Sequence, residues 1–540
     1  SEKNLSKYAS IESFARENGI DFYPAGRGIG HQVMVEEGYA FPGKFVVGSD
    51  SHSNMYGGIG CLGTPVVRTD AASIWATQQT WWQVPPVALV RLNGRLRPGV
   101  TGKDVIITLC GLFNNDQVLN HAVEFVGDGV RSLSVDERLT IANMTTEWGA
   151  LAGVFPIDAT TESWLKAREA KLLKKRGGEH PRLNAKAIDE LMSDCPAADP
   201  DAKYAKEMVL ELSKVEPHVS GPDHVKVMQR VKDIEEKKVK VDKAYLVSCV
   251  NSRSQDIAVA AELMEGQKVA DHVEFYVAAA SSEVQMEAEE AGDWNKLLSA
   301  GAKPLPPGCG PCIGLGKGLL EDGEVGISAT NRNFKGRMGS REAQAYLASP
   351  AIVAASAVKG YITRPQAMID SDVDAAAYDE AKVGTLVGGS SSSSSASSSA
   401  QRDLPSLVDG FPATAAAQIV FCDEDNINTD GIYAGKYTYQ DGMTPEQMGE
   451  VAMDNYDPDF NEFYTEGDIL VSGFNFGTGS SREQAATCLK EKGIPMVIAG
   501  SFSATYVRNA FNNGYLCVEC PGLIDTLRSK GVSKGGLTVR

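Results

Sequence analysis

The stretch KAYLVSCVNSR, from Lys243 to Arg253, shows the pattern that decides the fold. A short apolar run ends in a polar turn, which is typical of a buried strand that leads into a functional loop. Residues 44–51, KFVVGSDS, repeat this pattern. Between such strands we expect helices over 70–79, 163–175 and 187–214. This alternation predicts an α/β fold with functional groups at the carboxyl ends of the strands.

Composition and charge narrow the class of protein. The 540 residues are 43% hydrophobic and 23% charged, which is ordinary for a globular protein. At about 150 residues per domain, this length predicts about three to four domains. Lys and Arg number 52 against 70 Asp and Glu, so the net charge of −18 disfavours general binding to nucleic acid or anionic lipid. No apolar run reaches the length of about 18 residues that a membrane span needs.

A serine-rich tract divides the chain. Residues 388–400 read GGSSSSSSASSSA, and such a tract has no apolar face to bury. It therefore predicts a flexible linker, to which we assign residues 386–403. The linker separates a large body from a smaller C-terminal domain.

Three cysteines could share one site. Cys309 and Cys312 lie in PPGCGPCIGLG, where Pro and Gly form a rigid turn that can aim both sulfurs at one point. This spacing suits zinc, a redox pair or an iron–sulfur cluster. Cys249 follows a predicted strand, where it could be a ligand, a nucleophile or a small buried apolar residue. Three thiolates are too few for a structural zinc site, but they suit a cluster that keeps one metal open.

Acid–base groups occur at two other turns. Asp50, Ser51 and His52 follow the strand FVV, and His31 follows a glycine-rich turn. Adjacent side chains diverge in extended backbone, so a hydrolase triad is disfavoured and acid–base groups at a strand end are the better interpretation. Either histidine alone is more often a structural residue.

A third turn favours the binding of an anion. Residues 473–483 read GFNFGTGSSRE, with a strand before them and a helix after them. Ser480 and Glu483 have the spacing of a capping box, which predicts a helix N-terminus with free backbone N–H groups. Arg332, Arg337 and Arg482 carry guanidinium forks that match carboxylates, although surface arginines are the alternative interpretation.

Five segments, in chain order, resemble the signatures of the aconitase superfamily of iron–sulfur isomerases: GSDSHSNMYGG, SCVNSR, GCGPCIG, NRNFKGR and GTGSSRE. The resemblance implies a three-domain α/β/α body with a linker-tethered, smaller C-terminal swivel domain. The expected boundaries are 1–86, 87–205, 206–385 with the cysteines, 386–403 for the linker, and 404–540. Residues 71–86 and 425–441 are most similar to the fungal members of this superfamily that act in lysine biosynthesis through α-aminoadipate. Those enzymes are mitochondrial.

The resemblance also implies a set of site residues. One 4Fe-4S cluster would bind Cys249, Cys309 and Cys312, and its fourth iron would bind the substrate. Ser480 would take the proton next to a carboxylate. His31 with Asp50, and His52 with Glu147, would handle the hydroxide. The expected substrate contacts are Ser51, Asn143, Asn251, Arg332, Arg337, Lys436, Ser481 and Arg482.

Some positions depart from the family pattern. Phe421 takes the place of the arginine expected to bind a distal carboxylate, which disfavours citrate. The family's Asp–His acid pair would precede Ser1, so we expect a chain trimmed at both ends. The resemblance implies a monomer of the mitochondrial matrix that interconverts homoaconitate and homoisocitrate. Its partner would be this small tricarboxylic acid, with no membrane and no nucleic acid. The alternatives are isopropylmalate isomerase or aconitase activity, a cluster-free RNA-binding regulator, or an inactive remnant.

Overall fold

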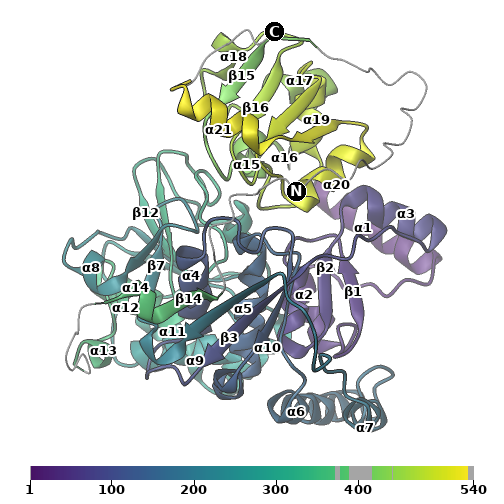
Figure 1. The fold of residues 1–540 in the computed structure, drawn as a ribbon. Helices are drawn as coiled ribbons and strands as arrows, with labels where there is room; N and C mark the ends of the chain where they lie inside the picture. The colour runs from purple at the N-terminus through teal and green to yellow at the C-terminus, as the bar shows by residue number, and fades with distance from the viewer. Residues whose placement is uncertain (1, 371–377, 388–415, 439, 441, 533–540) are drawn as a thin grey trace. The chain divides into compact units, whose positions relative to one another are not determined.

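The computed structural model describes residues 2–370, 378–387, 416–438, 440 and 442–532. The chain divides into two compact units (Figure 1). The first unit comprises residues 1–65, 91–202 and 210–384, and the second comprises residues 66–90, 203–209 and 385–540. Apart from its first two residues, the predicted linker lies outside the described residues. Helices and mostly parallel strands alternate in both units, which confirms the α/β class.

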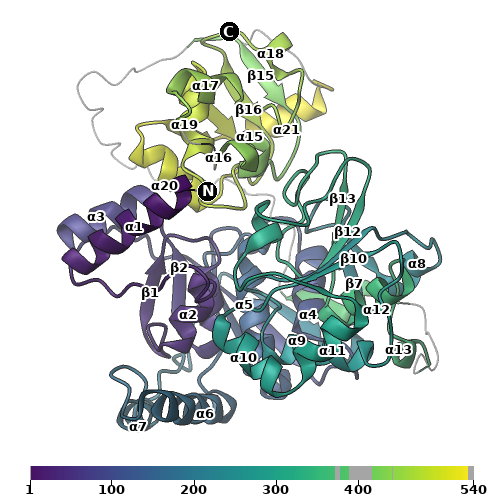
Figure 2. The same cartoon turned by 180° about the vertical axis from the view of Figure 1, so that it is seen from behind.

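The first unit contains a seven-stranded sheet (Figure 2). Its strand order is β11-β10-β9-β12-β13-β7-β8, and the first five of these strands run parallel. The helices α9 and α12 pack against each other, and α12 packs on β9. The bounds are β7 His218–Ser220, β8 Met228–Arg230, β9 Lys243–Leu246, β10 Glu274–Val277, β11 Lys303–Pro304, β12 Val325–Ser328, β13 Gln344–Leu347, α9 Ser254–Met264, α10 Ser282–Glu290, α11 Asp293–Ala300 and α12 Pro350–Lys359.

The position of these strands explains where functional loops gather. Strand β9 is buried along its whole length, because apolar side chains cover both of its faces. Cys249 follows the end of β9, and Asn331 follows the end of the neighbouring β12. Parallel strands bring their carboxyl ends to one edge of a sheet, so these two loops lie side by side.

A two-stranded sheet in the first unit lies next to the site residues Asp50 and His52 in the sequence. Strands β1 (Phe45–Gly48) and β2 (Leu62–Pro65) pair in parallel, and the 3₁₀ helix η1 (Ser53–Ile59) packs on α5 (Val135–Trp148). A Cβ atom at Gly58 would lie 2.5 Å from the backbone nitrogen of Leu139 in α5, so only glycine permits this close approach. Ser134 caps α5 by accepting from the backbone N–H of Glu137.

The second unit contains a four-stranded parallel sheet, in the order β15-β16-β17-β18. Its buried core includes Phe476, Leu489 and Tyr506. The bounds are α3 Arg68–Thr77, β15 Ile419–Cys422, α15 Thr429–Ile432, α16 Gly435–Thr438, α17 Pro445–Glu450, α18 Phe460–Phe463, β16 Ile469–Ser472, α19 Gln484–Glu491, β17 Met496–Ala499, α20 Ala504–Asn512, β18 Leu516–Glu519 and α21 Pro521–Ser529.

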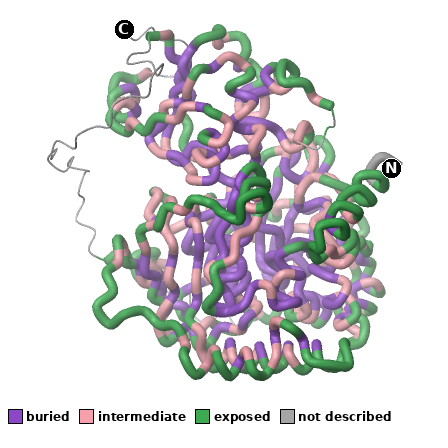
Figure 3. Tube along the Cα trace, turned by 90° about the vertical axis from the view of Figure 1, so that its right-hand side faces the viewer, coloured by how far each residue is buried: buried purple, intermediate pink, exposed green. Residues whose placement is uncertain are grey.

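The remaining elements lie in the first unit or span a boundary between the units along the chain. Figure 3 shows the exposed residues of the first helix, α1, in green beside the N-terminus. The bounds are α1 Glu2–Glu17, α2 Gly30–Glu36, β3 Val87–Asn93, α4 Gly102–Leu112, β4 Ala122–Val126, η2 Asp128–Ser132, β5 Ala152–Val154, α6 Ala159–Arg176, α7 Ala185–Ser193, β6 Lys206–Glu211, η3 Leu212–Lys214, α8 Val231–Glu235, η4 Gly310–Ile313, α13 Gln366–Asp370, α14 Glu380–Val383 and β14 Gly384–Val387.

One predicted helix is wrong over most of its length. The sequence predicted a helix over 187–214, but α7 ends at Ser193 and residues 206–211 form strand β6. Pro196 and Pro200 follow α7, and neither can donate the backbone hydrogen bond that a helix requires. In the described part of the chain, no helix has both the length and the apolar character needed to cross a bilayer.

Candidate active site

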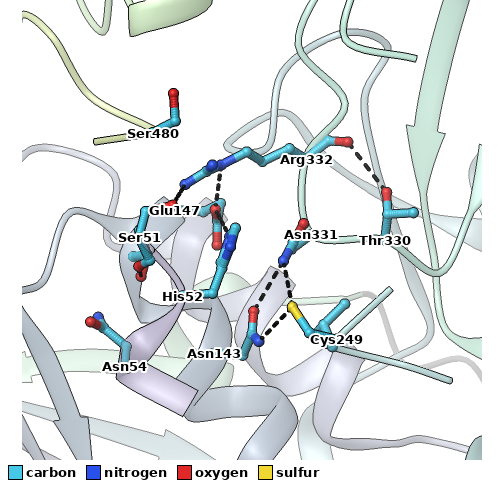
Figure 4. A network of polar contacts seen from close by, with 12 residues as sticks. Ser51, His52, Asn54, Asn143, Glu147, Cys249, Thr330, Asn331, Arg332 and Ser480 are labelled. Carbon is cyan, nitrogen blue, oxygen red and sulfur yellow. Dashed lines mark hydrogen bonds and ion pairs between the residues drawn. The ribbon is translucent and has the colours of Figure 1, made fainter. Parts of the chain in front are cut away.

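Cys249 belongs to a buried group of polar side chains in the first unit (Figure 4). The preceding Ser248 has a φ of 111°, a backbone conformation that side-chain-bearing residues rarely adopt. The Sγ atom of Cys249 accepts from Asn143 Nδ2 at 3.2 Å and from Asn331 Nδ2 at 3.5 Å. Two amide donors therefore point at this sulfur from two different elements.

Asn331 also reaches the second predicted cysteine. The Sγ atom of Cys312 donates to Asn331 Oδ1 at 3.5 Å, so one amide group bridges Cys249 and Cys312. Cys309 directly precedes η4, which contains Cys312. The Nε atom of Arg337 donates to the carbonyl of Cys312 at 3.0 Å, which holds this turn from the other side. The structure thus brings the predicted cysteines into one region of the first unit.

The three thiols differ in acidity. Burial alone would raise the pKa of Cys249, but the hydrogen bond and the positive charge of His31 outweigh burial and lower this pKa to about 6. Burial raises the pKa of Cys309 well above its usual range, and the charges of Cys312 and Cys249 raise it further. Burial also raises the pKa of Cys312. Cys249 therefore ionises more readily than Cys309 or Cys312.

The three cysteines are soft ligands, but they are not arranged to bind a single metal ion. Within the described residues, no three His, Cys, Asp or Glu side chains are arranged to hold one metal ion. In a 4Fe-4S cluster each thiolate binds a different iron, so the ligands stand further apart than those of a single ion. Soft thiolates favour iron–sulfur clusters, zinc or Cu(I) over hard cations.

An alternating chain of acids and bases extends from the thiol. His31 Nε2 lies 3.1 Å from Asp50 Oδ1, and the same oxygen lies 3.4 Å from His52 Nδ1. His52 Nε2 lies 2.9 Å from Glu147 Oε1, and Arg332 Nε lies 2.8 Å from that same oxygen (Figure 4). Both predicted His–acid pairs are therefore formed, and Asp50 joins them into one network.

The pKa shifts in this network follow from its charges. Burial and Arg332 lower the pKa of His52, but Glu147 and Asp50 outweigh them and raise it. Burial raises the pKa of Glu147, yet His52 and Arg332 together lower it. Burial lowers the pKa of His31, but Asp50 and Cys249 raise it well above its usual range. Both imidazoles therefore hold a proton more tightly than free histidine does.

The predicted serine lies in the second unit, in a turn after β16. The hydroxyl oxygens of Ser480 and Thr429 are 2.7 Å apart, and the backbone N–H of Ser480 donates to Thr429 Oγ1 at 3.2 Å. Arg482 Nη1 forms a buried ion pair with Asp430 Oδ1 at 2.7 Å. Thr429 and Asp430 were not among the predicted site residues. Both follow strand β15, and its adjacency to β16, which brings them beside Ser480, is seen only in the folded sheet.

The predicted capping box is wrong. Helix α19 begins at Gln484, and Glu483 occupies the N-cap with helical backbone angles, so Ser480 lies too far upstream to cap it. The Glu483 carboxylate instead accepts from Thr69 Oγ1 at 2.7 Å and from Asn513 Nδ2 at 2.9 Å. The Glu483 carboxylate, which the local spacing placed in a capping box, therefore bonds to residues that are distant in the sequence.

Four further predicted positions have different surroundings. Asn251 is buried and donates to Thr140 Oγ1 and Asp256 Oδ1. Lys436 Nζ lies 4.7 Å from the centre of the Tyr437 ring. The remaining two are Ser51, whose hydroxyl accepts from Arg332 Nη2 at 3.0 Å, and Ser481, which is half-buried beside Ser480.

Phe421 lies in the core of the second unit. Its side chain is fully buried in an apolar cluster with Ile469, Val471 and Ile524. An ionic side chain at this position would be buried in the sheet core, and the correspondence of Phe421 with a carboxylate-binding arginine stays a prediction.

Comparison with known proteins agrees with this geometry. Residues 1–360 match the model of the aconitase family (aconitate hydratase), and residues 392–522 match that of the aconitase C-terminal domain. The chain therefore belongs to the aconitase family, and it is an enzyme of the hydro-lyase class that acts on a small molecule. The predicted family, fold class and enzyme class are confirmed. An iron–sulfur cofactor follows from membership of this family.

The curated relatives are named more specifically. A protein of Yarrowia lipolytica named "Homoaconitase, mitochondrial" is 61% identical over 533 residues, which cover 98% of this chain and 77% of that protein. One of Candida parapsilosis with the same name is 57% identical, covering 100% of this chain and 78% of that protein. A solved 3-isopropylmalate dehydratase from Methanocaldococcus jannaschii is 29% identical over 23% of this chain and 81% of its own, with a TM-score of 0.19.

Proposed function

We propose that this chain interconverts homoaconitate and homoisocitrate by reversible hydration, in mitochondrial lysine biosynthesis. The names of the relatives support this substrate and this location. The main support is that the loop after β12 contacts both the cysteines and the acid–base residues. Asn331 bonds the sulfurs of Cys249 and Cys312, while the next residue, Arg332, bonds Glu147 and Ser51. Soft ligands and acid–base groups are thus fixed beside each other.

The donor set fits one 4Fe-4S cluster held by Cys249, Cys309 and Cys312. The amides of Asn143 and Asn331 would stabilise negative charge on sulfur, and the acidic thiol of Cys249 would ionise first. When bound, the cluster supplies a Lewis acid for the substrate hydroxyl and a carboxylate. Three protein ligands would leave one iron available for this role.

The residues around the thiols would manage protons. The imidazole of His52, held by Glu147 at Nε2 and by Asp50 at Nδ1, stays protonated at neutral pH more readily than a free imidazole. It is therefore suited to donate a proton to a departing hydroxide. His31 shares Asp50 and extends the same proton network.

Ser480 would act as the base that removes the proton next to a carboxylate. A hydroxyl is a weak base unless its neighbours stabilise the alkoxide. Thr429 can donate to Ser480 Oγ, and Arg482 follows two residues later with its charge held in place by Asp430. Arg332, Arg337 and Arg482 would neutralise the carboxylates of the substrate.

A substrate comparison tests the proposal. The protein is prepared anaerobically with iron and sulfide, and is given homoaconitate, aconitate or isopropylmaleate at equal concentrations. We expect loss of the unsaturated-acid absorbance to be fastest with homoaconitate. A higher kcat/KM for either of the other two acids would overturn the substrate assignment. Absence of turnover with all three acids, in protein that carries a cluster, would overturn the activity itself.

A further inference from the structure

Lys103 is a buried lysine that the catalytic scheme does not use. It lies in the first turn of α4 and its side chain has no exposed surface. Its Nζ atom donates to two backbone carbonyls, those of Thr330 at 2.5 Å and Ala329 at 3.4 Å. Burial of an ammonium group costs free energy unless its N–H groups are hydrogen-bonded. A lysine at this position therefore suggests a structural or functional role.

The two carbonyls belong to the loop that carries the site. Ala329 and Thr330 directly precede Asn331 and Arg332, whose side chains reach Cys249 and Glu147 (Figure 4). The peptide planes that Lys103 holds are therefore those that set the direction of both side chains. A change of orientation at residue 330 would move the Asn331 amide and the Arg332 guanidinium together.

Other bonds also hold the loop, and at its near end the backbone N–H of Ala329 donates to the carbonyl of Tyr245 at 2.9 Å. The side chain of Asn333 donates to the carbonyls of Ser220 and Ala345, which ties the far end of the loop to β7 and β13. The hydroxyl group of Thr330 bonds within the loop and its strand, to Ser328 Oγ and to the carbonyl of Arg332. Lys103 thus adds a side-chain tie from α4 to the near end of the loop.

Charge supports the same role. Burial lowers the pKa of Lys103 to about 8, while the charges of Glu147, Asp256, Cys312 and Asp104 raise it. The ammonium form therefore still dominates at neutral pH. Its hydrogen-bond partners are neutral carbonyls, so its positive charge also acts on the acidic groups of the site.

We propose that Lys103 is a positioning residue, whose ammonium group fixes the 329–332 loop and thereby aims Asn331 and Arg332. The proposal rests on the proposed function of this site, because it assigns these two side chains to the cofactor and the substrate. It predicts that loss of the ammonium group raises the Kd of a bound tricarboxylate and has only a small effect on Tm.

The test uses the cluster-loaded full chain and two substitutions. Lys103→Met keeps the length and removes the donors, and Lys103→Gln keeps one donor group. The matched control is Lys243→Met, because Lys243 is also buried and donates to a backbone carbonyl, that of Leu319 at 2.9 Å, as well as to Glu324. The readouts are KM and kcat for homoaconitate, the Kd of the unreactive acid tricarballylate by calorimetry, and Tm.

We expect Lys103→Met to raise both KM and the Kd of tricarballylate, on the order of 10- to 100-fold, as loss of charge-assisted hydrogen bonds would. Lys103→Gln should recover part of this loss, and Lys243→Met should lower Tm without changing the Kd. If Lys103→Met does not fold, a Kd that Lys103→Gln leaves unchanged overturns the proposal. An unchanged Kd in folded Lys103→Met, or an equal loss in Lys243→Met, also overturns it. If the unsubstituted chain binds tricarballylate but does not turn over homoaconitate, the proposed activity fails while a Kd dependent on Lys103 still supports the positioning role.

Discussion

Arg332 and His52 share a single oxygen of Glu147: Arg332 Nε lies 2.8 Å from Oε1, and His52 Nε2 lies 2.9 Å from the same atom. All three side chains are buried, so their charges interact strongly. The pKa of Glu147 is therefore lowered, and its charge, together with Asp50, raises the pKa of His52 despite the nearby guanidinium. This arrangement makes Glu147 the residue that sets the protonation of the proposed acid.

Removing the charge of Glu147 should make His52 a poorer proton donor. Glu147→Gln deletes the carboxylate that raises the pKa of His52, so the imidazole should lose its proton at a lower pH. We expect kcat to fall about 100- to 10,000-fold, as for loss of a general acid. The high-pH limb of the kcat profile should also move to lower pH. An unchanged limb would show that His52 is not the titrating group.

The hydroxyl at position 480 should be needed for turnover and not for folding. Ser480→Ala should lower kcat about 100- to 10,000-fold and leave Tm nearly unchanged. Thr429→Val, which removes the hydrogen bond to Ser480, should cause a smaller loss of about 10-fold. Ser503→Ala is the control, because Ser503 makes a comparable bond to Thr505 elsewhere in the second unit. Full activity in Ser480→Ala would contradict the assigned base.

The buried ion pair of Asp430 and Arg482 should matter far more for stability than an exposed pair. Asp430→Asn leaves Arg482 buried without its counter-charge and should cost about 3 to 5 kcal/mol of unfolding free energy. Asp423 and Arg528 form a pair of similar length whose side chains are 34% and 31% exposed. Asp423→Asn should cost about 0 to 1 kcal/mol. Urea unfolding measures both, and equal costs would contradict the reasoning.

The stability of the first unit should depend on pH through Glu283. Burial raises the pKa of this carboxyl, but Arg168 and Lys175 outweigh burial and lower it from 4.5 to about 2. The folded state thus binds the proton more weakly than the unfolded state. The stabilisation is complete above pH 4.5 and is lost as the pH falls toward 2.

The size of this effect is about 3 kcal/mol, at the conversion of about 1.4 kcal/mol per unit of pKa. Glu283→Gln should remove this part of the pH dependence and should also lower stability at pH 7, since Arg168 is left unpaired. Urea unfolding at a series of pH values is the measurement. An identical slope between pH 2 and pH 4.5 in both proteins would contradict the assignment.

Local patterns predicted the strand and loop of KAYLVSCVNSR, because an apolar run that ends in a polar turn has few other solutions. They could not predict Lys103, which reads as an ordinary residue in the first turn of a helix. Its partners lie 226 and 227 residues away. The false capping box has a related cause, since Glu483 bonds Thr69, 414 residues distant. Asp430 was missed because its role depends on the adjacency of β15 and β16, which only the folded sheet provides.

The central claim is that Cys249, Cys309 and Cys312 hold one 4Fe-4S cluster. The direct test is the iron and acid-labile sulfide content of the anaerobically reconstituted chain, beside that of Cys249→Ser and of Cys488→Ser. Cys488 is a buried cysteine of the second unit and serves as the control. We predict equal amounts of iron and sulfide at the level of one cluster per chain, lost in Cys249→Ser and retained in Cys488→Ser. A chain that takes up no cluster, or one whose content is unaffected by Cys249→Ser, would contradict the claim.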